Sequence, residues 1–312
     1  MIGILEHQRH EIYDQAIAII ETKLREGGYS LRQKDATLEV VVRNFQGAFA
    51  NAQAALEEFA ARHVDAVLTI GSPAAEVTKP YAKSRETPLI AIGCFDPVVM
   101  GLTDSYAGAG GNVTGSCYRV DATEQIQSGL LGLVPGLRRL GVVYRAGELQ
   151  SEIQLDEVQA SCGQLGIEVV SYNGQSGSEL AGAADFFLSA GVQAVFLLSD
   201  STSNNATEAE LAKLVGTLPT LGALETALRR GVLVGRVARW EELCERGAEM
   251  VLRVLEGTAA RSLPVYRGGK LKTVFNARTA RLLGLEPTAE LMASVDEVLY
   301  AGESDAEHRI DQ

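Results

Sequence analysis

Short apolar segments alternate with amphipathic helical segments in two successive series, and this alternation constrains the fold more than any other feature. In the first series the strands are expected at residues 2–5, 38–42, 64–70 and 89–92. The pattern recurs roughly 130 residues later, with strands expected at 140–144, 167–171, 192–198 and 219–222. Apolar strands that alternate with helices form parallel sheets covered on both faces. The sequence therefore predicts an α/β protein of two lobes with parallel sheets.

A glycine-rich segment at residues 108–115 separates the two series and is the first expected crossing between the lobes. The elements expected beyond residue 230 are too few for a third domain, so we expect them to return to one lobe and then the other. We predict that the first lobe contains residues 1–113 and 236–268, that the second contains 116–234 and 270–300, and that 303–312 form a polar tail.

The charge balance argues against a nucleic-acid-binding protein. The 312 residues include 28 Lys+Arg and 40 Asp+Glu, which gives a formal net charge of −12. Such a chain lacks the basic surface that binds phosphate backbones. No apolar run approaches the ~20 residues that span a bilayer. The length suits two domains of ~150 residues each.

The N-terminus and the cysteines leave the cellular compartment open. Met1 is followed directly by an expected strand, without the basic and apolar regions of a signal peptide. We expect either a cytoplasmic protein or a mature form whose leader has been removed. Cys162 and Cys244 lie in helical apolar stripes and are expected in the core, whereas Cys94 and Cys117 lie on expected loops and are predicted to be partly exposed.

Polar residues follow the ends of the expected strands, which is where open parallel sheets bind ligands. The residues considered at these ends include Glu6, His7, Ser72, Phe95, Asp96, Arg145, Glu148, Gln150, Ser151, Asp200, Ser201, Thr202 and Glu225. Helix N-termini after Ser72 and after Glu148 would present backbone N–H groups to an anion. Asp200 offers a carboxylate to an ammonium group. Helix capping is the alternative role for Ser72 and Asp200.

Motifs for metal or covalent chemistry are weak. His7 and His10 form an isolated HxxH, for which a solvated helix start is the simpler interpretation. The chain has no CxxC pair, no phosphate-binding loop motif and no GxSxG motif. Cys94 follows a strand, but a cysteine racemase needs two opposed thiols and only this one is a candidate. We expect no metal and no cofactor.

Several segments resemble ABC-transporter substrate-binding proteins of the tryptophan/tyrosine-binding type. The most specific is the sequence GGNVTG at residues 110–115, followed by LGLVPGLRRLGVVY at 131–144. The segments IGSPAA at 70–75, CFDPV at 94–98 and TVFN at 273–276 occur in the family's order and spacing. The similarity extends over about residues 2–285.

The resemblance implies two Rossmann-like lobes of the type I periplasmic binding protein fold, joined by three crossings, with a ligand held in the cleft between them. By resemblance, the turn that contains Ser72, Pro73, Ala74 and Ala75 and the loop from Glu148 to Ser151 hold the ligand carboxylate. Asp200 occupies the position of an acid that pairs with the ligand ammonium.

The chain departs from the family pattern at three strand ends. Glu6 and His7 stand where amide or hydroxyl groups are usual, and Arg145 begins a loop where Asn or Ser is usual. After the strand at 219–222, the acidic and hydroxyl pattern is reduced to Glu225 and Thr226.

These observations favour the solute-binding component of an ABC importer, a monomer that binds a small zwitterion such as an amino acid and delivers it to an ABC permease. For an aromatic ligand, Phe95 and Trp240 are candidates for stacking. By resemblance the protein works in the periplasm or as a lipid-anchored extracytoplasmic protein, whereas a native start at Met1 would make it cytoplasmic. The alternatives are a cytoplasmic sensor, a scaffold that no longer binds amino acids, and a cleft enzyme such as a cysteine racemase.

Overall fold

The computed structural model describes residues 1–31, 36–84, 86–108 and 111–300. The chain forms two compact units. Unit 1 contains Met1–Arg119 and Ala238–Lys270, and unit 2 contains Val120–Val237 and Leu271–Gln312. The chain therefore passes from one unit to the other three times. Gly110 and the tail expected at 303–312 lie outside the described residues.

Unit 1 is built on a parallel five-stranded sheet in the order β2-β1-β3-β4-β5. Its strands are β1 (Ile2–Glu6), β2 (Val40–Asn44), β3 (Ala66–Ile70), β4 (Leu89–Cys94) and β5 (Val113–Cys117). Four of these strands, β1, β3, β4 and the more polar β5, are buried along their whole length, and the first three are mostly apolar. A strand covered on both faces reads as a continuous apolar run, which explains why the sequence pattern located these three.

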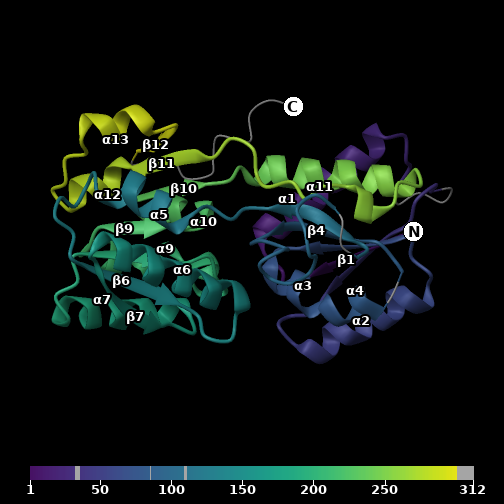
Figure 1. The fold of residues 1–312 in the computed structure, drawn as a ribbon, viewed down its shortest axis with the longest axis horizontal. Helices are drawn as coiled ribbons and strands as arrows, with labels where there is room; N and C mark the ends of the chain where they lie inside the picture. The colour runs from purple at the N-terminus through teal and green to yellow at the C-terminus, as the bar shows by residue number, and fades with distance from the viewer. Residues whose placement is uncertain (32–35, 85, 109–110, 301–312) are drawn as a thin grey trace. The chain divides into compact units, whose positions relative to one another are not determined.

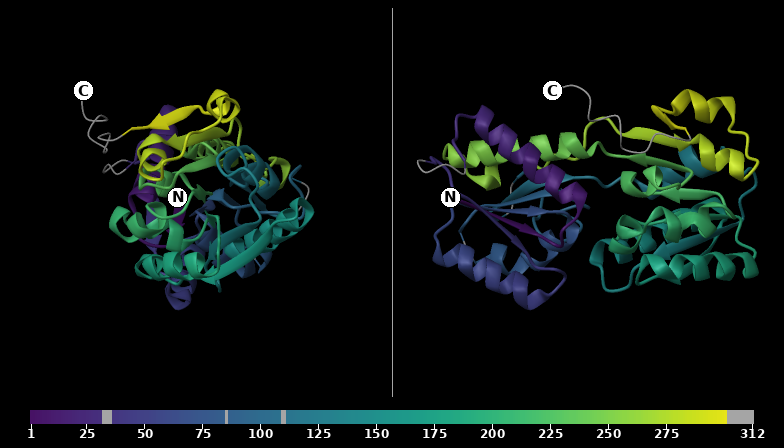
Figure 2. Two further views of the ribbon diagram at one scale, coloured as in Figure 1. Left: turned by 90° about the vertical axis from the view of Figure 1, so that its left-hand side faces the viewer. Right: turned by 180° about the vertical axis from the view of Figure 1, so that it is seen from behind.

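Helices cover both faces of this sheet. On one face α1 (Glu11–Glu26) and α11 (Trp240–Leu255) lie side by side, although they are far apart in the sequence (Figures 1 and 2). On the other lie α2 (Phe49–Ala61), α3 (Ser72–Val77) and α4 (Lys79–Ser84). Glycines allow close packing, because a Cβ on Gly247 would lie 2.6 Å from the Ile92 side chain and one on Gly3 would lie 2.7 Å from the Phe59 ring.

Unit 2 has a seven-stranded sheet in the order β12-β11-β10-β9-β8-β6-β7. Its strands are β6 (Arg139–Tyr144), β7 (Glu168–Asn173), β8 (Ala194–Leu197), β9 (Thr220–Gly222), β10 (Val234–Val237), β11 (Lys272–Asn276) and β12 (Glu297–Leu299). The expectation of parallel sheets fails at one pair, because β11 runs antiparallel to β10. The chain reaches β11 from unit 1, so no crossover helix within unit 2 imposes a parallel direction.

The helices of unit 2 include α6 (Leu149–Leu165), α7 (Leu180–Ser189), α8 (Ser201–Asn205), α9 (Glu208–Val215) and α10 (Glu225–Arg229). Short helices complete it: α5 (Ala122–Gln125), a π-helix (Ile126–Leu130), α12 (Ala277–Leu282) and α13 (Ala289–Ser294). No helix in the described part of the chain is long and apolar enough to cross a membrane.

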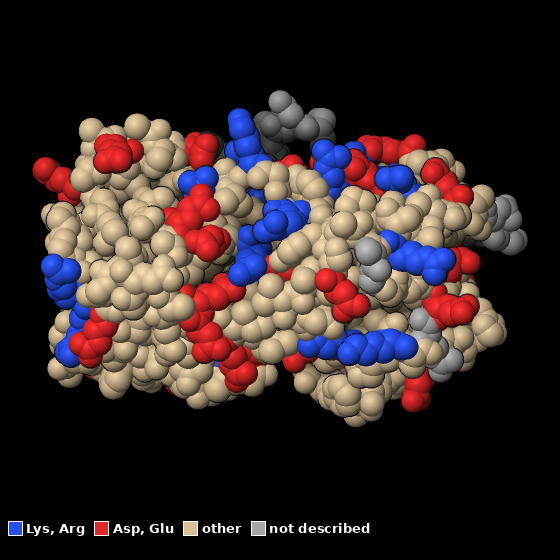
Figure 3. Space-filling view, in the orientation of Figure 1, with Lys and Arg blue, Asp and Glu red and all other residues tan. Residues whose placement is uncertain are grey.

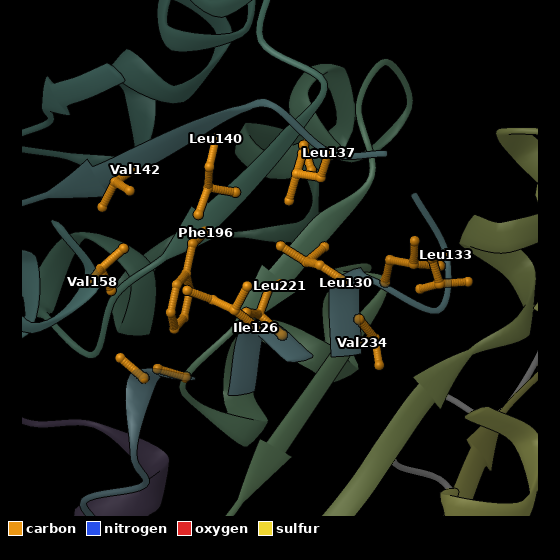
Figure 4. Packing of buried hydrophobic residues seen from close by; sticks show 14 of the residues in the cluster. Ile126, Leu130, Leu133, Leu137, Leu140, Val142, Val158, Phe196, Leu221 and Val234 are labelled. Carbon is orange, nitrogen blue, oxygen red and sulfur yellow. The ribbon is translucent and has the colours of Figure 1, made fainter. Parts of the chain in front are cut away.

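The sheet of unit 2 separates two apolar cores because side chains alternate along each strand. Leu140 and Val142 of β6 and Phe196 of β8 belong to one core, which also contains residues of the π-helix (Figure 4). Val143 of β6 and Leu197 of β8 belong to the core on the opposite face. Residues at the carboxyl ends of these strands are therefore held by rigid, fully buried neighbours.

The described end of the glycine-rich segment belongs to a strand rather than a crossing. Residues 113–115 are the first three residues of β5, which pairs with β4, and the first boundary between the units falls between Arg119 and Val120. A Cβ on Gly115 would lie 1.9 Å from the carbonyl oxygen of Ala91 in β4, so only glycine fits there. The glycines reflect close strand pairing as well as turns.

The exposure expected for Cys94 and Cys117 was wrong. Cys94 ends β4 with 0% exposure and Cys117 ends β5 with 2% exposure. They end the neighbouring strands β4 and β5 of the unit 1 sheet, and α11 packs against both strands. Burial raises the pKa of Cys117 to about 12 and that of Cys94 well above its ordinary value. The prediction that Cys162 and Cys244 are core residues is confirmed.

Candidate functional site

Asp200 of unit 2 is the centre of a buried polar network. It follows β8, acts as N-cap of α8 and is only 2% exposed. Its Oδ1 accepts a hydrogen bond from the Ser203 N–H at 2.9 Å, and its Oδ2 accepts one from the Ser151 hydroxyl at 2.8 Å. Ser151 lies in the first turn of α6, and its Oγ accepts in turn from the Arg145 N–H at 2.9 Å. Because β6 and β8 are parallel neighbours, the loops that follow them meet at one sheet edge.

Burial raises the pKa of the Asp200 carboxyl to about 7, and the negative charge of Glu148 acts in the same direction. The hydrogen bonds from Ser203 and Ser151 oppose this rise because they favour the ionised form. A cation bound next to such a buried acid would strongly stabilise its ionised form.

Glu148 is the N-cap residue of α6, and its carboxylate is already paired. Its Oε2 accepts hydrogen bonds from Gln150 Nε2 at 2.7 Å and from the Ser201 N–H at 3.0 Å. Its Oε1 forms an ion pair with Arg145 Nε at 3.0 Å. This internal carboxylate therefore uses one backbone donor at the start of α8 and neutralises Arg145.

Three further polar atoms of this network have no hydrogen-bond partner within the part of the chain that the structure describes. They are Gln150 Oε1, Ser199 Oγ and Ser203 Oγ, and each is buried. All three can accept a hydrogen bond. An ammonium group carries three donors and no acceptor. A carboxylate in one polar network with unused neutral acceptors is suited to bind such a group.

In unit 1 the strand ends carry a second, smaller group. Glu6 ends β1, is 5% exposed, and its Oε1 accepts from Asn44 Nδ2 at 3.0 Å. Ser72 starts α3, but it is not the side-chain cap that the sequence suggested, because Gly71 is the N-cap residue. Instead its Oγ accepts from the Phe95 N–H at 2.8 Å and lies 3.2 Å from the Tyr118 hydroxyl.

The remaining candidates near Ser72 are fixed by their own unit. Ala74 and Ala75 are fully buried in α3, and Pro73 is half-buried at its start. Phe95 is 0% exposed and packs edge-on against Tyr118. Trp240 packs against Gly93, and its indole N–H donates to the Ile12 carbonyl. Figure 3 shows acidic and basic side chains interspersed on the visible face of each unit.

Four predicted site residues make contacts within their own unit. The Asp96 Oδ1 caps the N–H groups of Val98 and Val99, while its Oδ2 accepts from the Tyr106 hydroxyl at 2.5 Å. The Thr202 hydroxyl donates to the Gly174 carbonyl at 2.7 Å. Glu225 forms ion pairs with Lys272 and Arg229, each at 2.7 Å. His7 is half-buried with its ring 5.1 Å from that of Phe45.

Sequence reasoning missed several members of these networks. Asn44, which holds Glu6, ends a strand that was expected two residues too early. Gln154 accepts from the Ser199 N–H at 2.8 Å. A signal for it was present, because Gln150, Ser151 and Gln154 share one face of α6 at helical spacing, and that face is buried.

A two-unit α/β protein with three chain crossings and buried, partly unused polar groups at its strand ends has the architecture of a ligand-binding protein. The comparison with known families is more specific. The family model for ABC transporter substrate binding proteins matches residues 1–299, so the chain belongs to this family.

Individual relatives are distant in sequence but close in fold. A tyrosine-binding protein of Clostridioides difficile (strain R20291) is 24% identical over 290 residues, which are 91% of this chain and 81% of that protein. The structure of an ABC domain from Streptococcus pneumoniae in complex with L-Trp has a TM-score of 0.84 at 23% identity, covering 96% of this chain and 99% of that one. A conserved domain protein from Vibrio cholerae has a TM-score of 0.85 at 21% identity, with the same coverage.

Proposed function

We propose that this protein binds an α-amino acid and serves as the solute-binding component of an ABC importer. The observation that carries this proposal is the environment of Asp200, whose buried carboxylate has unused acceptors beside it. In the proposal the carboxylate pairs with the ligand ammonium through a charge-assisted hydrogen bond. Family membership and the tyrosine-binding and L-Trp-bound relatives support an amino acid, with an aromatic one as the leading candidate.

The other end of the ligand is assigned to backbone donors. For its carboxylate we propose two candidate positions, one in each unit: the N–H groups at the start of α3, in the turn from Ser72 to Ala75, and the Gln150 N–H at the start of α6. Pro73 has no N–H, and the N–H groups of Ala75 and Ser151 already donate to the Gly71 and Glu148 carbonyls. Glu148 already accepts from the Ser201 N–H, which leaves fewer donors for an anion in unit 2, whereas unused acceptors for a cation remain. We therefore expect the ammonium contact to contribute more to affinity in unit 2 than the carboxylate contact does.

A binding role without catalysis agrees with the state of the thiols. A cysteine nucleophile acts as the thiolate, and burial opposes ionisation of Cys94 and Cys117. The proposed partner is an ABC permease, and we propose that the protein works as a monomer outside the cytoplasmic membrane. Ligand contacts would shift a conformational equilibrium rather than lower a reaction barrier.

Calorimetry of the wild type against the twenty amino acids, repeated with Asp200→Asn, tests the proposal. Removal of the acid leaves the buried ammonium without its charged partner, which is expected to weaken binding about 30-fold or more. Asp121→Asn is the matched control, because Asp121 is also an N-cap aspartate of unit 2 but is exposed. The control should bind within about twofold of the wild type. Failure to bind any amino acid, or unchanged binding by Asp200→Asn, would refute the ammonium model.

A further inference from the structure

Cys94 and Cys117 of unit 1 stand opposite each other at the ends of two paired strands. Cys94 is the last residue of β4, Cys117 is the last residue of β5, and the two are partners in the parallel register. Neighbouring strands of a sheet lie about 4.8 Å apart. A disulfide joins residues whose Cα atoms are about 4.4–6.8 Å apart. The spacing of the two strands therefore suits a bond between these thiols.

The contacts around the pair direct both thiols toward each other. The Ser116 hydroxyl donates to the Leu243 carbonyl of α11 at 2.8 Å. Because successive side chains of a strand point to opposite faces, the next residue, Cys117, points away from α11. The Cys94 thiol donates to the Ser116 carbonyl at 3.8 Å, and this carbonyl belongs to the peptide group that leads into Cys117. The sulfur of Cys94 is therefore already directed toward the end of β5.

The other two cysteines are placed differently. Cys244 lies in α11 and belongs to the apolar core that this helix forms with the sheet of unit 1. Cys162 lies in α6 and belongs to an apolar core of unit 2. All four cysteines are free thiols in the structure, and both of these are 0% exposed. They serve as internal controls for any reaction at the strand ends.

The electrostatic surroundings distinguish the two thiols of the pair. Burial is the main cause that raises the pKa of Cys94, and the neighbouring Cys117 is the next. Burial and Asp96 also raise the pKa of Cys117, whereas the charges of Arg267 and Arg119 act in the opposite direction. Nearby guanidinium groups favour the thiolate, which is the reactive form. Cys117 is therefore the thiol expected to react first.

We propose that Cys94 and Cys117 are a modification site at which a disulfide joins the ends of β4 and β5. The co-reactant is a disulfide oxidant, such as oxidised glutathione. The Cys117 thiolate attacks one sulfur of the oxidant, whose S–S bond breaks, so that a mixed disulfide forms and one thiol leaves. The Cys94 thiolate then attacks the Cys117 sulfur and releases the second thiol. The two protein thiols are oxidised, the oxidant is reduced to two thiols, and these take up the two protons.

The bond forms while the chain folds, because both thiols are almost fully buried once folding is complete. An oxidising compartment supplies the oxidant, and the proposed location outside the cytoplasmic membrane is such a compartment. Cys117 lies two residues before the boundary between Arg119 and Val120, so the bond would fasten the strand from which the chain leaves unit 1. The bond requires no ligand, so this inference and the proposed amino-acid binding stand or fall separately.

A count of thiols after oxidative refolding tests the proposal. The full chain is unfolded in urea with a reductant and refolded in a buffer of reduced and oxidised glutathione. It is then quenched with acid, alkylated in denaturant and digested for mass spectrometry. We expect alkylation of Cys162 and Cys244 alone, together with one pair of peptides linked through Cys94 and Cys117. Alkylation of all four cysteines, or a link through Cys162 or Cys244, would overturn the proposal.

Serine variants identify the pair independently of the linked peptides. Cys117→Ser removes one partner, so the refolded variant should keep three alkylated cysteines. If Cys117→Ser does not fold, as judged by circular dichroism, Cys94→Ser replaces it with the same expectation. Cys162→Ser is the matched control, because Cys162 is equally buried but lies outside the pair. This control should keep the link and one alkylated cysteine.

Thermal unfolding gives a second measurement. A disulfide restricts the unfolded chain, so the oxidised wild type should have a Tm about 5 °C or more above that of the reduced form. The Cys162→Ser control should keep this difference, and Cys117→Ser should lose it. A difference that persists in Cys117→Ser would overturn the assignment of the bond to this pair.

Discussion

The buried carboxylate of Asp200 should destabilise the ligand-free protein at neutral and alkaline pH, and Asp200→Asn should relieve this. The side chain is 2% exposed, and its pKa is about 7 in the folded protein against an ordinary value of 3.8. A pKa difference of about 3, at ~1.4 kcal/mol for each pH unit, corresponds to ~4 kcal/mol. This magnitude already contains the favourable bonds from Ser151 and Ser203.

The direction follows from the protons bound in each state. Below about pH 4 the carboxyl is protonated in both the folded and the unfolded protein, so it does not affect their balance. Between about pH 4 and 7 the folded protein keeps the proton and the unfolded chain loses it, so the free energy of unfolding falls as the pH rises. The full loss is reached above about pH 7. The Asn side chain does not titrate in this range, so the free energy of unfolding of the variant does not fall for this reason.

Urea unfolding of the wild type and Asp200→Asn, without ligand, at pH 5 and pH 8 measures the effect. The amide keeps an oxygen for the N–H of Ser203, so the helix cap is retained. We expect the variant to gain ~3 kcal/mol on the wild type in the free energy of unfolding between the two pH values, because about one pH unit of the decline already lies below pH 5. Asp121→Asn should show no such pH-dependent gain, because its side chain is exposed. An equal difference between Asp200→Asn and the wild type at both pH values would refute the reasoning.

Two further substitutions test the network and the strand pairing. Ser151→Ala removes a hydrogen-bond donor that favours the ionised form of Asp200. Amino-acid binding measured by calorimetry should therefore weaken by about 1 kcal/mol at pH 7, and by less at pH 9. Equal losses at both pH values would contradict this. Gly115→Ala places a Cβ against the β4 backbone and should lower the free energy of unfolding by at least about 2 kcal/mol in urea. A Cβ on Gly111 would meet open space, so Gly111→Ala should lower the free energy of unfolding by only about 1 kcal/mol. Similar losses for Gly115→Ala and Gly111→Ala would contradict this explanation.

The sequence was sufficient for the architecture because the apolar strands are buried on both faces. The runs that became β1, β3, β4, β6 and β8 stand out against amphipathic helices. Glu6 ends β1 and Asp200 follows β8, each at the carboxyl edge of its own sheet. The antiparallel β11 was not predictable in the same way. Periodicity marks a strand but carries no direction, and the connection through unit 1 removes the crossover rule that would supply one.

The glycine-rich segment shows a different limit. Glycine is typical both of turns and of close backbone approach, and the sequence does not distinguish the two. Gly111 has open space around it, whereas Gly115 lies against the carbonyl of Ala91. The burial of Cys94 and Cys117 depends on this same pairing of β4 with β5, which is why both were expected on loops.

The candidate site was predicted as a set of positions but not as a set of bonds. The strand-end rule selected Asp96, Asp200 and Glu225 alike, because all three follow strands. Their partners differ: Asp96 caps backbone N–H groups, Glu225 neutralises two cations, and Asp200 alone among the three has unpartnered acceptors next to it. Hydrogen-bond saturation, which only three-dimensional structure provides, separates structural acids from an acid available to a ligand.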